Sequence, residues 1–130
     1  MKQLFVLCLS ATLCFPAYAG WVEVGKTSSW TIYVDPGSYQ RTKSIVRMNY
    51  LVDFSTNSAR KIYASSIDTA EYDCADGRYR LLGFVEYTGS MATGEVYLSH
   101  DKAADWEGIT PNTMSHLLWK TACFGSPNNG

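Results

Sequence analysis

The chain of 130 residues contains four cysteines, and the chemistry open to a cysteine depends on the redox state of its compartment. Cys8 and Cys14 lie within the first nineteen residues, whereas Cys74 and Cys123 lie far apart in the remainder. If the first nineteen residues are removed during export, Cys74 and Cys123 form the one intramolecular disulfide left to the mature chain. We therefore predict a bridge between these two residues.

The first nineteen residues, 1–19, have the three parts of a secretory signal peptide. Lys2 supplies the positive charge, an apolar run follows from Leu4 to Phe15, and Ala17, Tyr18 and Ala19 form a small-x-small cleavage site. We predict cleavage between Ala19 and Gly20. The mature protein is then exported, either periplasmic or secreted, with one domain over residues 20–124.

Neither a lipid anchor nor a membrane span is expected. A lipoprotein signal needs a small residue directly before the lipidated cysteine, but Leu13 precedes Cys14. A spanning helix needs about twenty apolar residues, and neither the leader nor any later segment reaches that length. The tail, residues 125–130, contains only Gly, Ser, Pro and Asn, and we expect it to be disordered.

Two histidines are the available bases at neutral pH. His100 lies near Asp101, Asp105 and Glu107, but none of the usual metal-ligand spacings is present, and solvated loop charge explains this stretch. His116 falls within a predicted helix with no nucleophile motif beside it, and no phosphate-binding glycine loop occurs. The sequence therefore predicts no cofactor, no metal and no enzymatic activity.

Basic residues gather around one predicted hairpin and form the candidate partner-binding site: Arg41, Lys43, Arg47, Arg60 and Lys61. Such a patch would attract an acidic partner, for example a glycosaminoglycan-rich matrix protein. Ordinary solvated charge is the commoner explanation for residues of this kind.

Charge and composition narrow the class of partner. The net charge is −1, and it becomes −2 when Lys2 is lost with the leader, so the basic stripe and high pI of nucleic-acid binders are absent. The chain contains nine Tyr, four Trp and five Phe. This aromatic content suits half-buried strands and a small core, and an aromatic binding face is the alternative interpretation.

Two segments alternate between apolar and polar residues as strands do. In residues 45–54, one face carries Val46, Met48, Tyr50, Val52 and Phe54. Residues 30–34 form an earlier strand, which Asp35, Pro36 and Gly37 should end in a turn. A polar turn at residues 55–58 should return the chain into an antiparallel strand over residues 61–69.

Asp76 and Gly77 predict a tight primed turn between a strand that ends near Cys74 and another over residues 78–87. We expect alternation to divide the second strand into two faces: Tyr79, Leu81, Val85 and Tyr87 on one, and Arg78, Arg80, Leu82, Phe84 and Glu86 on the other. Gly83 is a candidate bulge. A further strand is expected over residues 95–99.

One segment has the periodicity of a helix, with an apolar face formed by Met114, Leu117, Leu118 and Thr121 or Ala122. Thr110 is the expected N-cap, Pro111 suits the first helical position, and Gly125 is a C-terminal stop. Cys123 lies at the helix end. A bond to Cys74 would attach that end to the sheet beside the Asp76 turn.

An ordered series of residues resembles the bacterial surface-adhesin protein E family. It begins with Tyr33, Val34, Asp35, Pro36, Ser38 and Arg41 before the 46–54 strand, and continues with Glu71, Asp73, Cys74, Arg78 and Arg80. It ends with Tyr87, Met91, Gly94, Trp106, Pro111 and Cys123. The resemblance covers nearly the whole mature chain.

The resemblance implies an α+β fold, namely a single antiparallel β-sheet of about six strands with a C-terminal helix packed on one face and tethered by the disulfide. It also implies adhesion to host extracellular-matrix or serum proteins, although the family's adhesins are lipid-anchored and this chain lacks the required signal. Alternatives are a periplasmic envelope protein or an enzyme inhibitor, whose plugging loop would be residues 99–110. A homodimer through an edge strand stays open.

Overall fold

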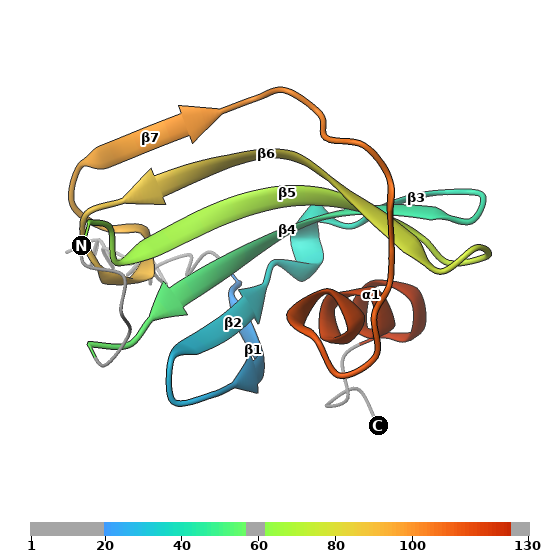
Figure 1. The fold of residues 1–130 in the computed structure, drawn as a ribbon, viewed down its shortest axis with the longest axis horizontal. Coiled ribbons are helices and arrows are strands. Elements are labelled where there is room, and N and C mark those ends of the chain that lie inside the picture. The colour runs from blue at the N-terminus through green and yellow to red at the C-terminus, as the bar shows by residue number, and fades with distance from the viewer. Residues whose placement is uncertain (1–19, 57–61, 126–130) are drawn as a thin grey trace, which may run out of the picture.

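Antiparallel strands build one twisted sheet in the computed structural model, which describes residues 20–56 and 62–125 (Figure 1). Six strands follow the order β1-β2-β4-β5-β6-β7, while β3 pairs with β4 and β8 pairs with β6. The strands are β1 Val22–Lys26, β2 Trp30–Val34, β3 Gln40–Thr42, β4 Ile45–Phe54, β5 Ser65–Asp73, β6 Arg78–Tyr87, β7 Val96–His100 and β8 Glu107–Gly108. The predicted α+β architecture is confirmed.

The helix α1, Met114–Phe124, packs on one face of the sheet, which we call the inner face (Figure 1). Its buried residues are Leu118, Thr121 and Ala122, within the periodic set that the sequence indicates. They join a core whose sheet residues are Ile32, Val34, Val46, Met48, Tyr50, Val52, Ala70 and Tyr72. Gly25 permits the close approach of β1, because a Cβ there would collide with the Leu117 side chain.

The opposite, outer face is covered at one place by a short 3-10 turn, η2 Ser90–Ala92. The Ser65 hydroxyl donates to the Gly89 carbonyl at 2.6 Å and accepts from the backbone N–H of Ala92 at 2.9 Å. The Asp53 carboxylate accepts from the backbone N–H of Met91. This turn contacts β4, whose outer side carries the fully buried Leu51.

Two of the predicted turns form, one of them with a different geometry. Asp35 accepts from the Gly37 N–H and starts η1, Pro36–Ser38, as the sequence indicates. The β5–β6 hairpin is also confirmed, but its loop has four residues, 74–77, and only Gly77 adopts a positive φ, of 62°. A two-residue primed turn was the wrong prediction because the Asp73 side chain supports the longer loop.

The alternation predicted for β6 is wrong beyond its middle. Thr69 pairs with Gly83 and Ala70 with Leu81, so Leu82 is an extra residue in a bulge. The bulge reverses the faces that follow it: Phe84 and Glu86 share the inner face with Tyr79 and Leu81, while Val85 and Tyr87 share the outer face with Arg78 and Arg80. The predicted bulge at Gly83 is therefore present at the adjacent residue. Glycine is required at position 83 because a Cβ there would collide with the His100 carbonyl.

Two element boundaries differ from the sequence prediction, and a third agrees with it. The N-cap of α1 is Thr113, whose hydroxyl accepts from the His116 N–H, and not Thr110, because Asn112 adopts a φ of 61° that interrupts a helix begun at Pro111. Gly125 ends α1 as expected, with a φ of 87°. The strand predicted over residues 61–69 is β5, which begins at Ser65; residues 57–61 lie outside the described part of the chain.

Candidate functional site

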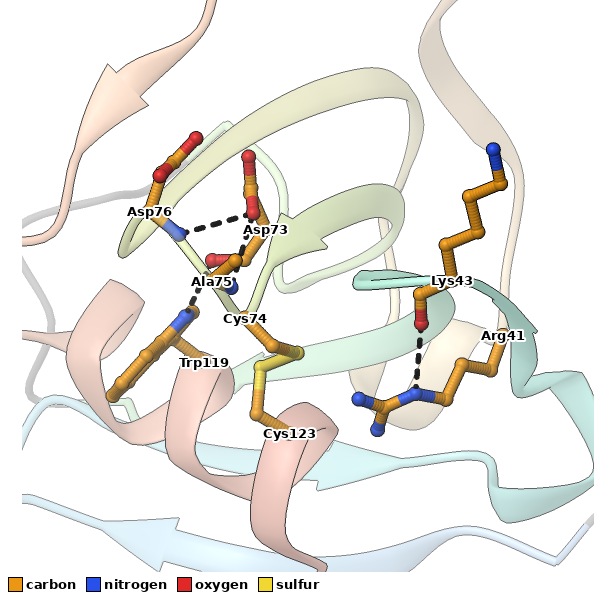
Figure 2. The surroundings of a disulfide bond; sticks show 8 residues. All are labelled: Arg41, Lys43, Asp73, Cys74, Ala75, Asp76, Trp119 and Cys123. Carbon is orange, nitrogen blue, oxygen red and sulfur yellow. Dashed lines mark hydrogen bonds between the residues drawn. A yellow bond between two sulfur atoms is a disulfide. The ribbon is translucent and has the colours of Figure 1, made fainter.

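The end of the sheet that carries the β5–β6 hairpin is held to α1 by the predicted disulfide, and we call it the stapled end. Cys74 and Cys123 are bonded, with Cα atoms 5.6 Å apart and a sequence separation of 49 (Figure 2). The indole N–H of Trp119 donates to the Asp73 carbonyl at 3.0 Å. One covalent bond and one partly buried hydrogen bond therefore fix the helix to the same hairpin.

Asp73 organises the hairpin loop with its side chain. One carboxylate oxygen accepts from the backbone N–H groups of Ala75 and Asp76, both at 3.1 Å (Figure 2), and the other accepts from Arg78 at 3.0 Å. The hydrogen bond from the Asp76 N–H, followed by the pairing with Arg78, lowers the pKa of Asp73. Asp73 is a structural carboxylate, since its hydrogen-bond acceptors are occupied and it is 3% exposed.

A charged ladder lies on the outer face beside the stapled end. Arg80 donates to Glu71 through two nitrogens, at 2.8 and 3.1 Å. The guanidinium groups of Arg78 and Arg80 stack over the Trp106 ring, 5.1 and 4.8 Å from its centre. Trp106 is therefore one wall of a packed cation-aromatic cluster.

Residues 99–110, the predicted plugging loop, do not project from the protein. The Ala104 N–H donates to the Leu81 carbonyl, β8 pairs with Arg78 and Tyr79, and the Ile109 N–H donates to the Gly77 carbonyl. The segment lies along the edge of β6, so it is not the projecting loop that the inhibitor hypothesis requires. The sequence could not show this because every one of these contacts is long-range.

At the other end of β6, the edge strand β7 has all five residues exposed, and we call this the open end. Its apolar side chains are 58%, 50% and 49% exposed at Val96, Tyr97 and Leu98. β7 pairs with β6 on one side only, and no described strand pairs with its other side (Figure 1). An unprotected edge with large apolar side chains is a template for an incoming strand.

The predicted basic cluster is divided by the strand register. Gln40 lies opposite Arg47 and Arg41 opposite Val46, so Arg47 lies on the outer face and Arg41 on the inner side. Lys43 lies at the β3–β4 turn, where its carbonyl accepts from the Arg41 guanidinium at 3.1 Å (Figure 2). Arg60 and Lys61 fall outside the described residues. The structure therefore does not bring Arg41 and Arg47 onto one face.

Neither histidine lies in a catalytic arrangement of described residues. The His100 ring stacks on Phe84 at 5.5 Å, and His116 stacks on Trp119 while its Nδ1 accepts from the Asn112 N–H. Within residues 20–56 and 62–125, no group of three His, Cys, Asp or Glu could hold a metal ion. No helix in this part of the chain is long and apolar enough to cross a membrane.

These features define a class of protein, an α+β domain with one helix bonded covalently to an antiparallel sheet and an unprotected sheet edge. Within that class, the family model for Surface-adhesin protein E matches residues 21–124. The chain belongs to this family, as the series of residues in the sequence indicates. Membership supports an exported protein with an adhesive role.

Solved structures of Haemophilus influenzae protein E share the fold. Crystal form II of that protein is 15% identical, with a TM-score of 0.62 over 84% of this chain and 91% of the other. Protein E from non-typeable Haemophilus influenzae is 16% identical, with a TM-score of 0.57 over 82% and 77%. No curated protein sequence matches the chain.

Proposed function

We propose that the chain is an exported, non-enzymatic adhesin that binds an extended segment of a host extracellular-matrix or serum protein along β7. The observation that carries the proposal is the exposure of Val96, Tyr97 and Leu98 on a strand whose second edge is not paired by any described strand. Backbone hydrogen bonds along the edge would supply affinity, and the three side chains would supply selectivity.

Family membership supports this choice over a role inside the envelope, because surface adhesion is the property for which the family is named. The position of the edge supports it as well. β7 lies away from the disulfide, so a partner can add a strand without disturbing the bonded helix (Figure 1).

The leader belongs to the same proposal. Cleavage between Ala19 and Gly20 would release residues 20–124 as the adhesive domain, and N-terminal sequencing of the exported protein tests it: a first residue other than Gly20 contradicts this site. Cell fractionation then separates an adhesin, found at the surface or in the medium, from a periplasmic envelope protein.

The direct test is binding of the oxidised protein to a panel of purified matrix and serum proteins. The double variant Val96→Lys with Leu98→Lys should reduce binding at least tenfold, because it places charge on the edge without removing any buried side chain. Phe124→Lys is the matched control, since Phe124 is 74% exposed at the stapled end. Equal loss in both variants, or in neither, contradicts a site at β7.

Self-association is a distinct outcome of the same experiment. If sedimentation shows a dimer that the β7 double variant abolishes, and no panel protein binds, the edge pairs two copies of the chain and the adhesive assignment fails.

The basic residues offer a second contact for an acidic partner. Lys43 at the turn could act with either Arg41 or Arg47, and Arg60 and Lys61 extend the predicted set. Substituting Arg41, Lys43 and Arg60 together with Gln should lower retention on heparin; unchanged retention assigns these residues to ordinary solvated charge.

A further inference from the structure

α1 covers only part of the inner face, and beyond its first residue, Met114, the open end contains a cavity of about 470 Å³. This volume lies in the range of small-molecule sites. Strands β2, β4, β5 and β6 all contribute residues to its lining.

Among the lining residues that the structure describes, two carry carboxylates and none carries a basic side chain. Glu86 lies opposite Ser66 and Phe84 lies opposite Asp68, so the carboxylates of Asp68 and Glu86 are diagonal neighbours on the inner face. Their charges repel each other in a half-buried site. A cation between or beside them would relieve this repulsion.

Asp68 is only partly satisfied by the protein. Its Oδ2 accepts from the Tyr50 hydroxyl at 3.0 Å, whereas its Oδ1 is buried without a hydrogen-bond partner among the described residues. Burial raises the pKa of Asp68, the Ser66 and Tyr50 hydroxyls lower it, and the charge of Glu86 raises it again. A buried acceptor without a donor is costly, and a positive charge close to the carboxylate offsets part of that cost.

Aromatic rings surround these carboxylates. Trp30, Phe54, Tyr63 and Phe84 line the cavity. Phe54 meets Tyr63 edge to face at 5.5 Å, and Tyr63 stacks on Tyr97 of β7 at 6.2 Å. Ring faces attract cations, and the combination of ring faces with a carboxylate is suited to an organic ammonium group.

We propose that this cavity binds an alkylammonium group, whose positive charge pairs with the carboxylates of Asp68 and Glu86 while aromatic rings lie around the charge and Val52, Leu81 and Met114 contact the alkyl chain. The ammonium group can come from a free amine or from a lysine side chain of a bound protein. This inference stands independently of strand addition at β7.

The test is titration of the oxidised protein with n-pentylammonium, followed by backbone amide NMR. Saturable shifts should concentrate at Val52, Ser66, Asp68 and Glu86. n-Pentanol, which has the same chain length without charge, should bind at least tenfold more weakly. No saturable shift with any ammonium probe, or equal affinity for the alcohol, overturns the proposal.

Asp68→Asn should raise the dissociation constant at least tenfold. The amide oxygen of this variant can still accept from Tyr50, so the fold is kept and the unliganded thermal midpoint should be equal to or above that of the natural protein. Glu71→Gln is the matched control, because it removes a charge from the outer face of the same strand and should bind normally. Normal binding by Asp68→Asn overturns the assigned role of Asp68.

Two further probes separate the sources of the ammonium group: a lysine-containing peptide and the same peptide acetylated on the lysine. Binding of pentylammonium and not of either peptide identifies a free amine. Binding of the unmodified peptide, lost on acetylation, identifies a lysine side chain. Either result can occur whether or not β7 captures a matrix protein, so the two proposals fail separately.

Discussion

The stapled end and the open end of the same sheet differ in how their polar and apolar groups are satisfied. At the stapled end, Trp119 of α1 donates a hydrogen bond to the Asp73 carbonyl of β5, and Cys123 of α1 is bonded to Cys74 of the hairpin loop. At the open end, Leu98 is half exposed and Asp68 retains a buried oxygen without a described partner. The stapled end therefore holds the helix to the sheet, whereas our proposals place binding at the open end.

The largest expected effect comes from removing the disulfide, with Cys74→Ala and Cys123→Ala combined. Closing a loop with a separation of 49 residues stabilises a fold by about 4 kcal/mol in the chain-entropy model. Thermal unfolding under oxidising conditions should show a midpoint lower by on the order of 20 °C. A thermal midpoint unchanged from that of the natural protein would show that the disulfide at the stapled end does not stabilise the fold.

A smaller effect is expected from Asp73→Asn, and it depends on pH. Because the pKa of Asp73 is lowered in the folded state, its carboxylate stabilises the fold above the ordinary value of 3.8, and this contribution is lost as the pH falls through the lowered pKa. The variant should be less stable at neutral pH and should approach the natural protein in acid.

The control for this pH profile is Asp76→Asn, which alters a carboxylate that is 70% exposed and 3.8 Å from the same arginine, Arg78. Its denaturation curves should follow those of the natural protein at each pH. If Asp73→Asn and Asp76→Asn give the same profile, general charge and not the Asp73 hydrogen bonds accounts for the acid sensitivity.

The smallest effect on stability is expected at the open end. The β7 double variant, Val96→Lys with Leu98→Lys, should change the free energy of unfolding by less than about 1 kcal/mol, since the two residues are 58% and 49% exposed. Denaturant titration measures this. A loss comparable to that of the disulfide variant would abolish the contrast between the two ends.

Local features of the fold were predictable from the sequence. The Cys74–Cys123 bond follows from counting cysteines after the leader is removed, and α1 follows from the spacing of Leu117, Leu118 and Thr121. Each of these signals lies in the identity of a residue or in a short period. The N-cap failed because Thr110 and Thr113 are equally good capping residues, and the positive φ of Asn112 decides between them.

The candidate sites were much less predictable. The sequence did not single out the exposed side chains of β7 or the pairing of Asp68 with Glu86, since both depend on strand order. The pairing also depends on the bulge at Leu82, which alternation alone cannot locate. The contact of Trp106 with Arg78 and Arg80 joins distant segments, so only the folded chain reveals it.

The bulge in β6 has a consequence for length variation in this strand. Leu82 is supernumerary to the pairing with β5, and Gly83 leaves room for the His100 carbonyl. Deleting Leu82 would restore a regular ladder and keep Phe84 and Glu86 pointing inward. Deleting any one of residues 84–86 would instead turn the residues that follow the deletion to the opposite face of the sheet. Side chains that now line the cavity would then lie on the outer face. A homologue that lacks the residue equivalent to Leu82 can therefore conserve the cavity, whereas a homologue that lacks one of the residues equivalent to 84–86 cannot.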